Sequence, residues 1–302
     1  MSTSPANASP FSVTTDATHL GVLTLEPNQG PMVILDQPLI ERLEATLNSL
    51  PAGLRGLVLA SGSSRVFVAG ADLKAIMAMS HGELETYLAF GQRVFGMLCK
   101  LPFPTVAAIN GAVLGGGLEL AMHCDALVAA NPPAKDGQPG RPYPVGLPEA
   151  GLAICPGWGG TNLLPARMDP VDAMRRTCAG QTMLVGEARA GGLFDGFAEE
   201  AAGLIDAAKD WLRTHADAHI GRTDGHPLRW IGRPDRRDGA RVAVDVADIG
   251  SSSDEGLACL KAVHAGLESG WPAALKVERE ELNRLRGEPA GRLKIAAFFN
   301  RK

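Results

Sequence analysis

A run of three glycines followed by an acidic residue is the pattern with the clearest chemical meaning. Gly115, Gly116 and Gly117 follow an apolar segment and open a predicted helix that carries Glu119. Uncovered backbone N–H groups and the positive end of the helix dipole together form an anion site. Glu119 lies three residues after Gly116, roughly on the same helix face. The pattern therefore favours a carboxylate beside a developing oxyanion. A flexible turn with a surface glutamate is disfavoured by the apolar flanks.

A second acidic residue stands next to a second glycine turn. Glu149 follows Pro148, and Gly157 belongs to the Pro-Gly-Trp-Gly-Gly-Thr sequence at 156–161. Alone, Glu149 would be a solvated loop residue. As a pair, Glu119 and Glu149 would supply one general acid and one general base, as the addition of water across a double bond requires.

The third segment, 67–73, consists mainly of small residues that would let a ligand approach the backbone. Asp72 precedes a predicted helix, so the simplest interpretation is a strand-to-helix turn with an aspartate at the N-cap.

Several other kinds of site are excluded by their missing motifs. The sequence has no phosphate-binding P-loop, no G-x-G-x-x-G dinucleotide fingerprint and no G-x-S-x-G nucleophile elbow. His215 and His219 have the spacing of metal ligands on a helix but lack a third ligand, so we predict no metal site. We expect His123 to be a hydrogen-bonded interior residue.

Apolar runs that alternate with helical patterns must position these residues. Strands are predicted at 19–25, 55–61, 66–72, 104–109 and 125–130. Helices are predicted at 39–50, from about 73, at 83–100, from 115, and over most of the chain after 170. This alternation indicates an α/β fold with crossover connections.

Composition excludes other classes of partner. Among 302 residues, 29 Lys and Arg oppose 33 Asp and Glu, and this net charge of −4 argues against nucleic-acid and membrane-surface binding. The most apolar stretch, 106–130, holds four polar residues that a membrane span would not tolerate. Five cysteines without a C-x-x-C predict buried free thiols in a reducing compartment. Because the first basic residue is Arg42, we expect no leader peptide and a cytoplasmic location.

The chain divides into three predicted regions. Residues 1–16 form a loose arm, 17–198 an α/β core, and 199–302 a mostly helical region with an irregular arginine-rich loop at 221–250. Aspartates are mixed with those arginines, so a solvated loop is favoured over a nucleic-acid patch. Another irregular, proline-rich insertion is predicted at 131–144.

Taken together, the three motif segments resemble a known family. Residues 61–73, 104–130 and 146–164 are similar, in this order, to the signature regions of the enoyl-CoA hydratase/isomerase (crotonase) family. The resemblance continues through 180–195 and the tail at 274–302, so it covers most of the chain. In style it is closest to the hydratase module of multifunctional β-oxidation enzymes, without their dehydrogenase half.

The resemblance implies a crotonase-like spiral of repeated β-β-α units with a C-terminal helical region. It implies an enoyl-CoA hydratase whose substrate is an acyl-CoA thioester. Coenzyme A enters as part of that substrate, so no separate cofactor is expected. A homotrimer or hexamer is also implied.

Residue roles follow from the same resemblance. The backbone N–H groups of Ala71 and Gly116 would form the oxyanion hole, and preorganised donors of this kind stabilise an enolate. Glu119 and Glu149 would hold a water molecule between them, with Glu119 helping its attack at the β-carbon and Glu149 exchanging the proton at the α-carbon. The residues implied in substrate and coenzyme A binding are Ala69, Gly70, Asp72, Leu73, Gly115, Pro148 and Gly157.

Three departures keep alternatives open. The connection between Asp125 and Pro148 is longer than usual, 29–39 lacks the Asn-Ala-Leu pattern, and the 221–250 loop is extended. An isomerase or an acyl-CoA hydrolase could use the same oxyanion hole. A third hypothesis belongs to a different class of function: the protein is a non-catalytic acyl-CoA-binding or RNA-binding relative. The glutamate pair and the net charge disfavour this hypothesis.

Overall fold

Two sheets of different size organise the core. The computed structural model describes residues 9–134, 138, 140–233 and 253–300. The larger sheet is parallel apart from its antiparallel first pair, β1–β2. Its strands, in spatial order, are β1 (Val13–Thr15), β2 (Leu20–Leu25), β3 (Gly56–Ser61), β5 (Thr105–Ile109), β7 (Ala126–Ala130) and β10 (Gly196–Ala198).

The smaller sheet repeats the connectivity of the larger one. Each of β3, β5 and β7 is followed in the chain by a short strand that pairs in the second sheet, and helical turns then return the chain. This arrangement confirms the expected spiral of β-β-α units. The short strands are β4 (Val66–Val68), β6 (Ala112–Leu114), β8 (Pro144–Gly146) and β9 (Thr182–Leu184), in that spatial order.

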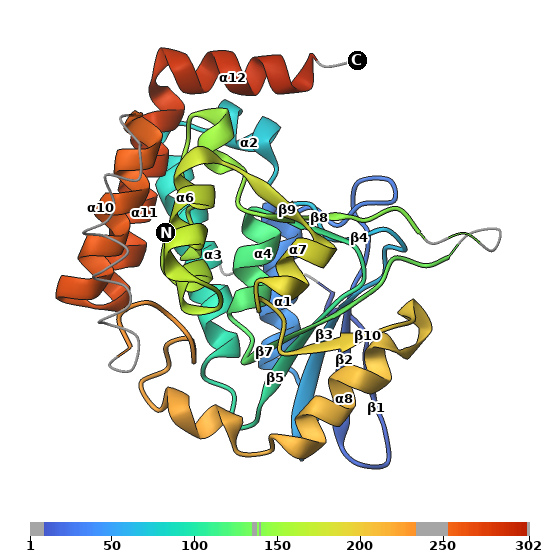
Figure 1. Ribbon diagram of the computed structural model, residues 1–302. Helices are drawn as coiled ribbons and strands as arrows, with labels where there is room; N and C mark the ends of the chain where they lie inside the picture. The colour runs from blue at the N-terminus through green and yellow to red at the C-terminus, as the bar shows by residue number, and fades with distance from the viewer. Residues whose placement is uncertain (1–8, 135–137, 139, 234–252, 301–302) are drawn as a thin grey trace.

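Helices cover both sheets and extend beyond them (Figure 1). In chain order they are α1 (Gln37–Asn48), α2 (Leu73–Ala78), α3 (His81–Leu98), α4 (Gly116–Met122), α5 (Gly160–Leu163), α6 (Pro170–Ala179), α7 (Val185–Ala190), α8 (Leu204–Thr214), α10 (Asp254–Ser269), α11 (Trp271–Gly287) and α12 (Pro289–Phe299). Single 3-10 turns are η1 (Glu149–Leu152), η2 (Leu164–Ala166), η3 (Ala201–Gly203) and η4 (Ala218–Arg222). In the described part of the chain, no helix has the length and apolar character needed to cross a membrane.

The central strands are buried on both faces, as their continuous apolar sequences indicate. Successive side chains point to opposite faces. Val58 of β3 therefore packs with α8, while its neighbours Leu57 and Leu59 join the main core. Helix α8 thus closes one face of the larger sheet, and α4 contacts β5 and β7.

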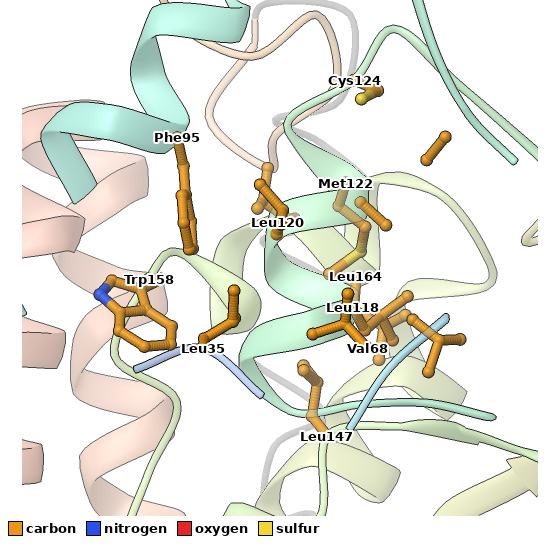
Figure 2. Close-up of a cluster of buried hydrophobic side chains, with 14 of the residues drawn as sticks. Leu35, Val68, Phe95, Leu118, Leu120, Met122, Cys124, Leu147, Trp158 and Leu164 are labelled. Carbon is orange, nitrogen blue, oxygen red and sulfur yellow. The ribbon is translucent and has the colours of Figure 1, made fainter. Parts of the chain in front are cut away.

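Helix α4 lies at the centre of the molecule and is buried along its whole length. Figure 2 shows Phe95 and Trp158 to one side of this helix and Val68 on the other. The rings of Phe95 and Trp158 meet edge to face with their centroids 5.2 Å apart. This packing fixes the helix that carries the glycine triplet and Glu119.

The N-terminal arm is more ordered than predicted from residue 9 onward. Phe11 is buried and its N–H donates to Thr46 Oγ1 at 2.8 Å, and Val13–Thr15 forms the edge strand β1. Residues 1–8 lie outside the described part. The sequence did not indicate this strand because serine, threonine and proline dominate the segment.

The arginine-rich loop also differs from the expectation, because Arg222 is buried rather than solvated. Its guanidinium binds both carboxylate oxygens of Asp125, at 2.6 and 3.0 Å. It also donates to three backbone carbonyls, those of Cys99, Leu101 and Phe103, at 2.6 to 2.9 Å. Arg222 therefore ties the segment after α8 to the end of α3. The last arginines of the loop, 236, 237 and 241, fall outside the described residues.

Candidate active site

One cavity collects nearly all the predicted site residues. It has a volume of about 330 Å³ and lies between α4, the start of α2, η1 and the C-terminal helices. Predicted residues that line it are Ala69, Gly70, Ala71, Leu73, Gly115, Gly116, Glu119, Pro148, Glu149 and Gly157. Asp72 does not line the cavity. As the residue type suggested, its carboxylate caps α2 by accepting from the N–H groups of Lys74 and Ala75.

Apolar side chains that the sequence reading did not single out complete the cavity. They come from α2, α3, the turn after η1, and the two last helices, α11 and α12. They include Ile76, Leu88, Leu152, Ile154, Trp158, Leu282 and Phe298. The walls can therefore hold an apolar group, while the polar groups are confined to a few positions.

Two backbone N–H groups in the cavity are available to a ligand. In the part of the chain that the structure describes, neither Ala71 N–H nor Gly116 N–H donates to a protein atom. Leu35 pairs on both sides of Ala71, donating to Gly70 O at 2.9 Å and accepting from Asp72 N at 3.3 Å. The local chain is thus held in place while the Ala71 amide stays free.

Gly116 has its free amide because it begins α4, where N–H groups have no partner within the helix. A Cβ atom here would lie 2.3 Å from the Trp158 ring, so only glycine fits. Two preorganised donors at one cavity are the geometry needed to stabilise an oxyanion.

Glu119 is fully buried and tightly held. Its Oε1 accepts from the N–H groups of Trp158 at 2.7 Å and Gly160 at 2.8 Å. Burial raises the pKa of Glu119 well above its usual range, and the negative charges of Glu278 and Glu149 raise it further. The two backbone donors act in the opposite direction.

Glu149 lies at the start of η1 and has an unsatisfied oxygen. Its Oε2 is covered from solvent and has no hydrogen-bond partner among the described residues. Burial of the carboxyl group, with a smaller contribution from the charge of Glu278, raises its pKa to about 8. A protonated carboxyl group with a free oxygen at a cavity is suited to donating a proton to a bound ligand.

The absence of a side chain at Gly115 leaves room for the carboxyl group of Glu149, and this gives a sharp prediction. Gly115 has a φ of +51°, and a Cβ atom here would lie 2.5 Å from Glu149 Oε1. We expect Gly115→Ala to displace the carboxyl group and to reduce kcat about 100-fold, as misplacing a reacting group by about 1 Å commonly does. Gly186→Ala is the control. Gly186 is helical, and a Cβ atom added there would meet nothing within 4 Å, so this variant should keep full activity.

A third buried carboxylate, Glu278, was not predicted. It lies on α11, is fully buried, and accepts hydrogen bonds from the 159–161 turn. Burial raises its pKa to about 7. A signal was present in the sequence, because Glu278 continues the spacing of the buried residues Trp271, Ala274, Leu282 and Leu285 along one helix face.

The remaining candidates are structural. His123 is buried, as expected, with Nδ1 2.8 Å from Glu119 O, although its Nε2 has no partner in the described structure. Burial lowers the pKa of His123 to about 4, so the ring is neutral. All five cysteines are buried and free. Among the described residues, no group of three His, Cys, Asp or Glu is arranged to bind a metal ion.

Comparison with known proteins identifies the family of the chain. The fold brings two backbone N–H groups and two buried carboxyl groups together at one cavity. The enoyl-CoA hydratase/isomerase family model matches residues 21–221. The chain therefore belongs to the enoyl-CoA hydratase/isomerase family.

Two kinds of curated relative match the chain. A probable enoyl-CoA hydratase of Bacillus subtilis is 35% identical over 63% of this chain and 70% of its own length. The fatty acid oxidation complex subunit alpha of Vibrio cholerae is 33% identical over 68% of this chain. The match spans only 28% of that subunit's length.

Solved structures confirm the fold. An enoyl-CoA hydratase from Bacillus anthracis aligns over 96% of both chains with a TM-score of 0.57 and 24% identity. An enoyl-CoA hydratase/isomerase from Mycobacterium paratuberculosis aligns over 96% of this chain and 98% of its own, with a TM-score of 0.65 and 16% identity. At this level of identity, the likeness concerns the fold alone.

Proposed function

We propose that the protein is an enoyl-CoA hydratase that adds water across the 2,3 double bond of a 2-enoyl-CoA thioester. The observation that carries the proposal is the presence, in one cavity, of two free N–H groups and two buried glutamates. Glu119 and Glu149 supply the acid and base, and Ala71 and Gly116 supply the oxyanion donors.

The proposed reaction uses these four groups in a defined order. The thioester carbonyl oxygen accepts hydrogen bonds from the two N–H groups, which stabilise the negative charge that develops on it. Glu119 acts in its ionised form, which the N–H groups of Trp158 and Gly160 favour, and accepts a proton from water as the hydroxyl oxygen bonds to the β-carbon. Glu149 donates its proton to the α-carbon, and proton exchange then restores both carboxyl groups.

The raised pKa of Glu149 gives this reaction a pH dependence. A carboxyl group with a pKa of about 8 stays protonated at neutral pH and loses its proton as the pH rises further. We therefore expect kcat/KM for hydration to fall above about pH 8. A profile that stays flat to pH 10 would contradict the assignment of Glu149 as the proton donor.

Isomerisation of the double bond within the same family is the second candidate. It is favoured by the asymmetry of the pair, since Glu119 Oε1 accepts from two backbone donors whereas Glu149 Oε2 has no partner in the described part of the chain. A single proton carrier suffices for isomerisation. Glu119→Gln should abolish hydration but retain isomerisation of 3-enoyl-CoA if isomerisation is the main reaction.

The deciding experiment follows the ultraviolet absorbance of the conjugated thioester in crotonyl-CoA and longer 2-enoyl-CoAs. Loss of absorbance with 3-hydroxyacyl-CoA as product supports hydration. If no enoyl-CoA is consumed, the proposal fails and thioester hydrolysis becomes the next reaction to test.

The proposal also covers cofactor use, assembly and cellular location. Coenzyme A enters with the substrate and no separate cofactor is needed. The protein assembles as a homotrimer or hexamer, which analytical ultracentrifugation of the purified protein can test. Its proposed location is the cytoplasm.

A further inference from the structure

We propose that Glu278 is a positioning residue, which holds the turn that binds Glu119 and places a third negative charge behind the glutamate pair. This inference deepens the proposed hydratase function and rests on it.

The carboxylates of Glu119 and Glu278 bind alternate N–H groups of one turn. Trp158 and Gly160 donate to Glu119, at 2.7 and 2.8 Å. Gly159 donates to Glu278 Oε2, and Thr161 donates to Glu278 Oε1 with its N–H at 3.0 Å and its hydroxyl at 2.5 Å. The four consecutive amides of this turn are therefore shared between two carboxylates, and a shift of one carboxylate moves the donors of the other.

The turn can take this form only because its second residue is glycine. Gly159 has a φ of +101°, and a Cβ atom here would lie 2.4 Å from the Trp271 ring. Trp271 begins α11, the helix that carries Glu278. The same helix thus supplies both the acceptor for the turn and the wall behind it.

Glu278 carries its negative charge without a cation. Among the residues that the structure describes, no Lys, Arg or His forms an ion pair with it, and only N–H and hydroxyl donors compensate the charge. Glu281 on the same helix, in contrast, pairs with Lys261 and Arg284. A buried carboxylate without a cation is costly, and strongly perturbed groups of this kind concentrate at functional sites.

Few other groups near Glu278 can change charge close to neutral pH. From α4, His123 is neutral because burial lowers its pKa to about 4. Burial raises the pKa of the Cys155 and Cys259 thiols, on the turn and on α10, well above their usual range. A hydrogen bond between the free thiols of Cys178 on α6 and Cys259 lowers the pKa of Cys178. Arg279 of α11 turns away to Glu85 of α3 at 2.8 Å.

The charge of Glu278 therefore acts mainly on the other two carboxyl groups. It raises the pKa of both Glu119 and Glu149. A nearby negative charge favours the protonated form of an acid. The pH range in which one glutamate of the pair is protonated and the other is ionised consequently lies higher than it would without the charge of Glu278.

The decisive variant is Glu278→Gln. Its amide retains one acceptor, but its NH₂ group cannot accept from the opposing N–H donor, so the turn and Glu119 are displaced. We expect kcat for hydration to fall about 100-fold with KM changed less than threefold. Both limbs of the kcat/KM profile should move to lower pH, because the negative charge has been removed.

Matched variants separate this role from simple structural support. Glu281→Gln removes the same charge from the same helix without touching the turn, and its pH profile should match the wild type. Thr161→Val removes one donor to Glu278 and should move both limbs in the same direction by a smaller amount. Thr177→Val removes a buried hydroxyl that donates to Ala173 O within α6, and it should leave the profile unchanged.

A measurement independent of turnover distinguishes failure of this inference from failure of the hydratase proposal. With ¹³C-labelled glutamate carboxyl groups, NMR follows the titration of Glu119 and Glu149 directly. The signal that is lost in Glu119→Gln or in Glu149→Gln assigns each resonance to its residue. If wild-type protein hydrates no enoyl-CoA, the hydratase proposal fails, while this titration still tests Glu278.

The expected result is a lower titration midpoint for both glutamates in Glu278→Gln. Unchanged midpoints, or an unchanged pH profile despite a lower melting temperature, would overturn the inference. If Glu278→Gln does not fold, Thr161→Val against Thr177→Val decides the question by the same two readouts.

Discussion

Glu149→Gln should abolish hydration of 2-enoyl-CoA while leaving the fold intact. Glutamine has nearly the same shape but cannot donate a carboxylic acid proton to the α-carbon. General acid–base groups contribute about 10²- to 10⁴-fold to a rate, and we expect kcat to fall about 1,000-fold or more. The change is measured with crotonyl-CoA at neutral pH.

The structure explains why the variant should remain folded. Glu149 Oε2 has no hydrogen-bond partner in the described structure, and the carboxyl group carries a desolvation cost that glutamine avoids. The melting temperature should therefore stay the same or rise. Glu268→Gln, on the exposed side of α10, is the matched control for loss of one carboxylate. Undiminished turnover in Glu149→Gln would remove this residue from the mechanism.

The largest effect on stability is expected at Arg222. Replacing it with methionine leaves Asp125 buried without its cation and leaves three backbone carbonyls without their guanidinium donor. Breaking a buried ion pair by removing one partner costs about 3 to 5 kcal/mol. We expect the free energy of unfolding to fall by about that amount, measured by urea denaturation.

Two comparisons identify the cause of this loss. Arg213→Met removes an exposed arginine that pairs with Asp210, and exposed pairs contribute about 0 to 1 kcal/mol. Hydration by Arg222→Met, measured well below its melting temperature, should remain, since Arg222 does not line the cavity. A loss of stability no greater than that of Arg213→Met would show that the buried pair does not stabilise the fold.

The sequence was informative where a secondary-structure element is long and regular. The apolar runs of β3, β5 and β7 span five or six residues, and the structure confirms them as strands. Strands β6, β8 and β9 have three residues each, which is too short for a periodic pattern, and they form because their neighbours supply hydrogen bonds. Composition likewise gave no sign of β1.

For the site, local motifs identified the groups that precede residue 160. Glu119 and Glu149 could be found because glycine turns and small residues mark them in the sequence, and the cavity brings them together. Glu278 and Arg222 were missed because their partners lie far away in sequence, 117 positions for Thr161 and 97 for Asp125. A charged residue in a polar segment is normally exposed. The helical spacing indicates that Glu278 lies on the buried face of α11, but only the folded chain shows its partners and the burial of Arg222.

Helix α11 follows Glu119, Glu149 and the turn at 158–161 in the sequence, and this has a consequence for the order in which the site can form during synthesis. Residues 20–180 leave the ribosome before α11, and they include Glu119, Glu149 and the cavity-lining residues Ala71 and Gly116. The amides of Gly159 and Thr161 then still lack their acceptor, and the Gln92 amide, which bonds to both Gly157 O and Leu275 O, lacks one partner. Domains emerge N-terminus first at about 5 to 20 residues per second. The nascent protein therefore carries Glu119 and Glu149 before the turn at 158–161 has all its acceptors, and the turn and the cavity wall are complete only after α11 has docked.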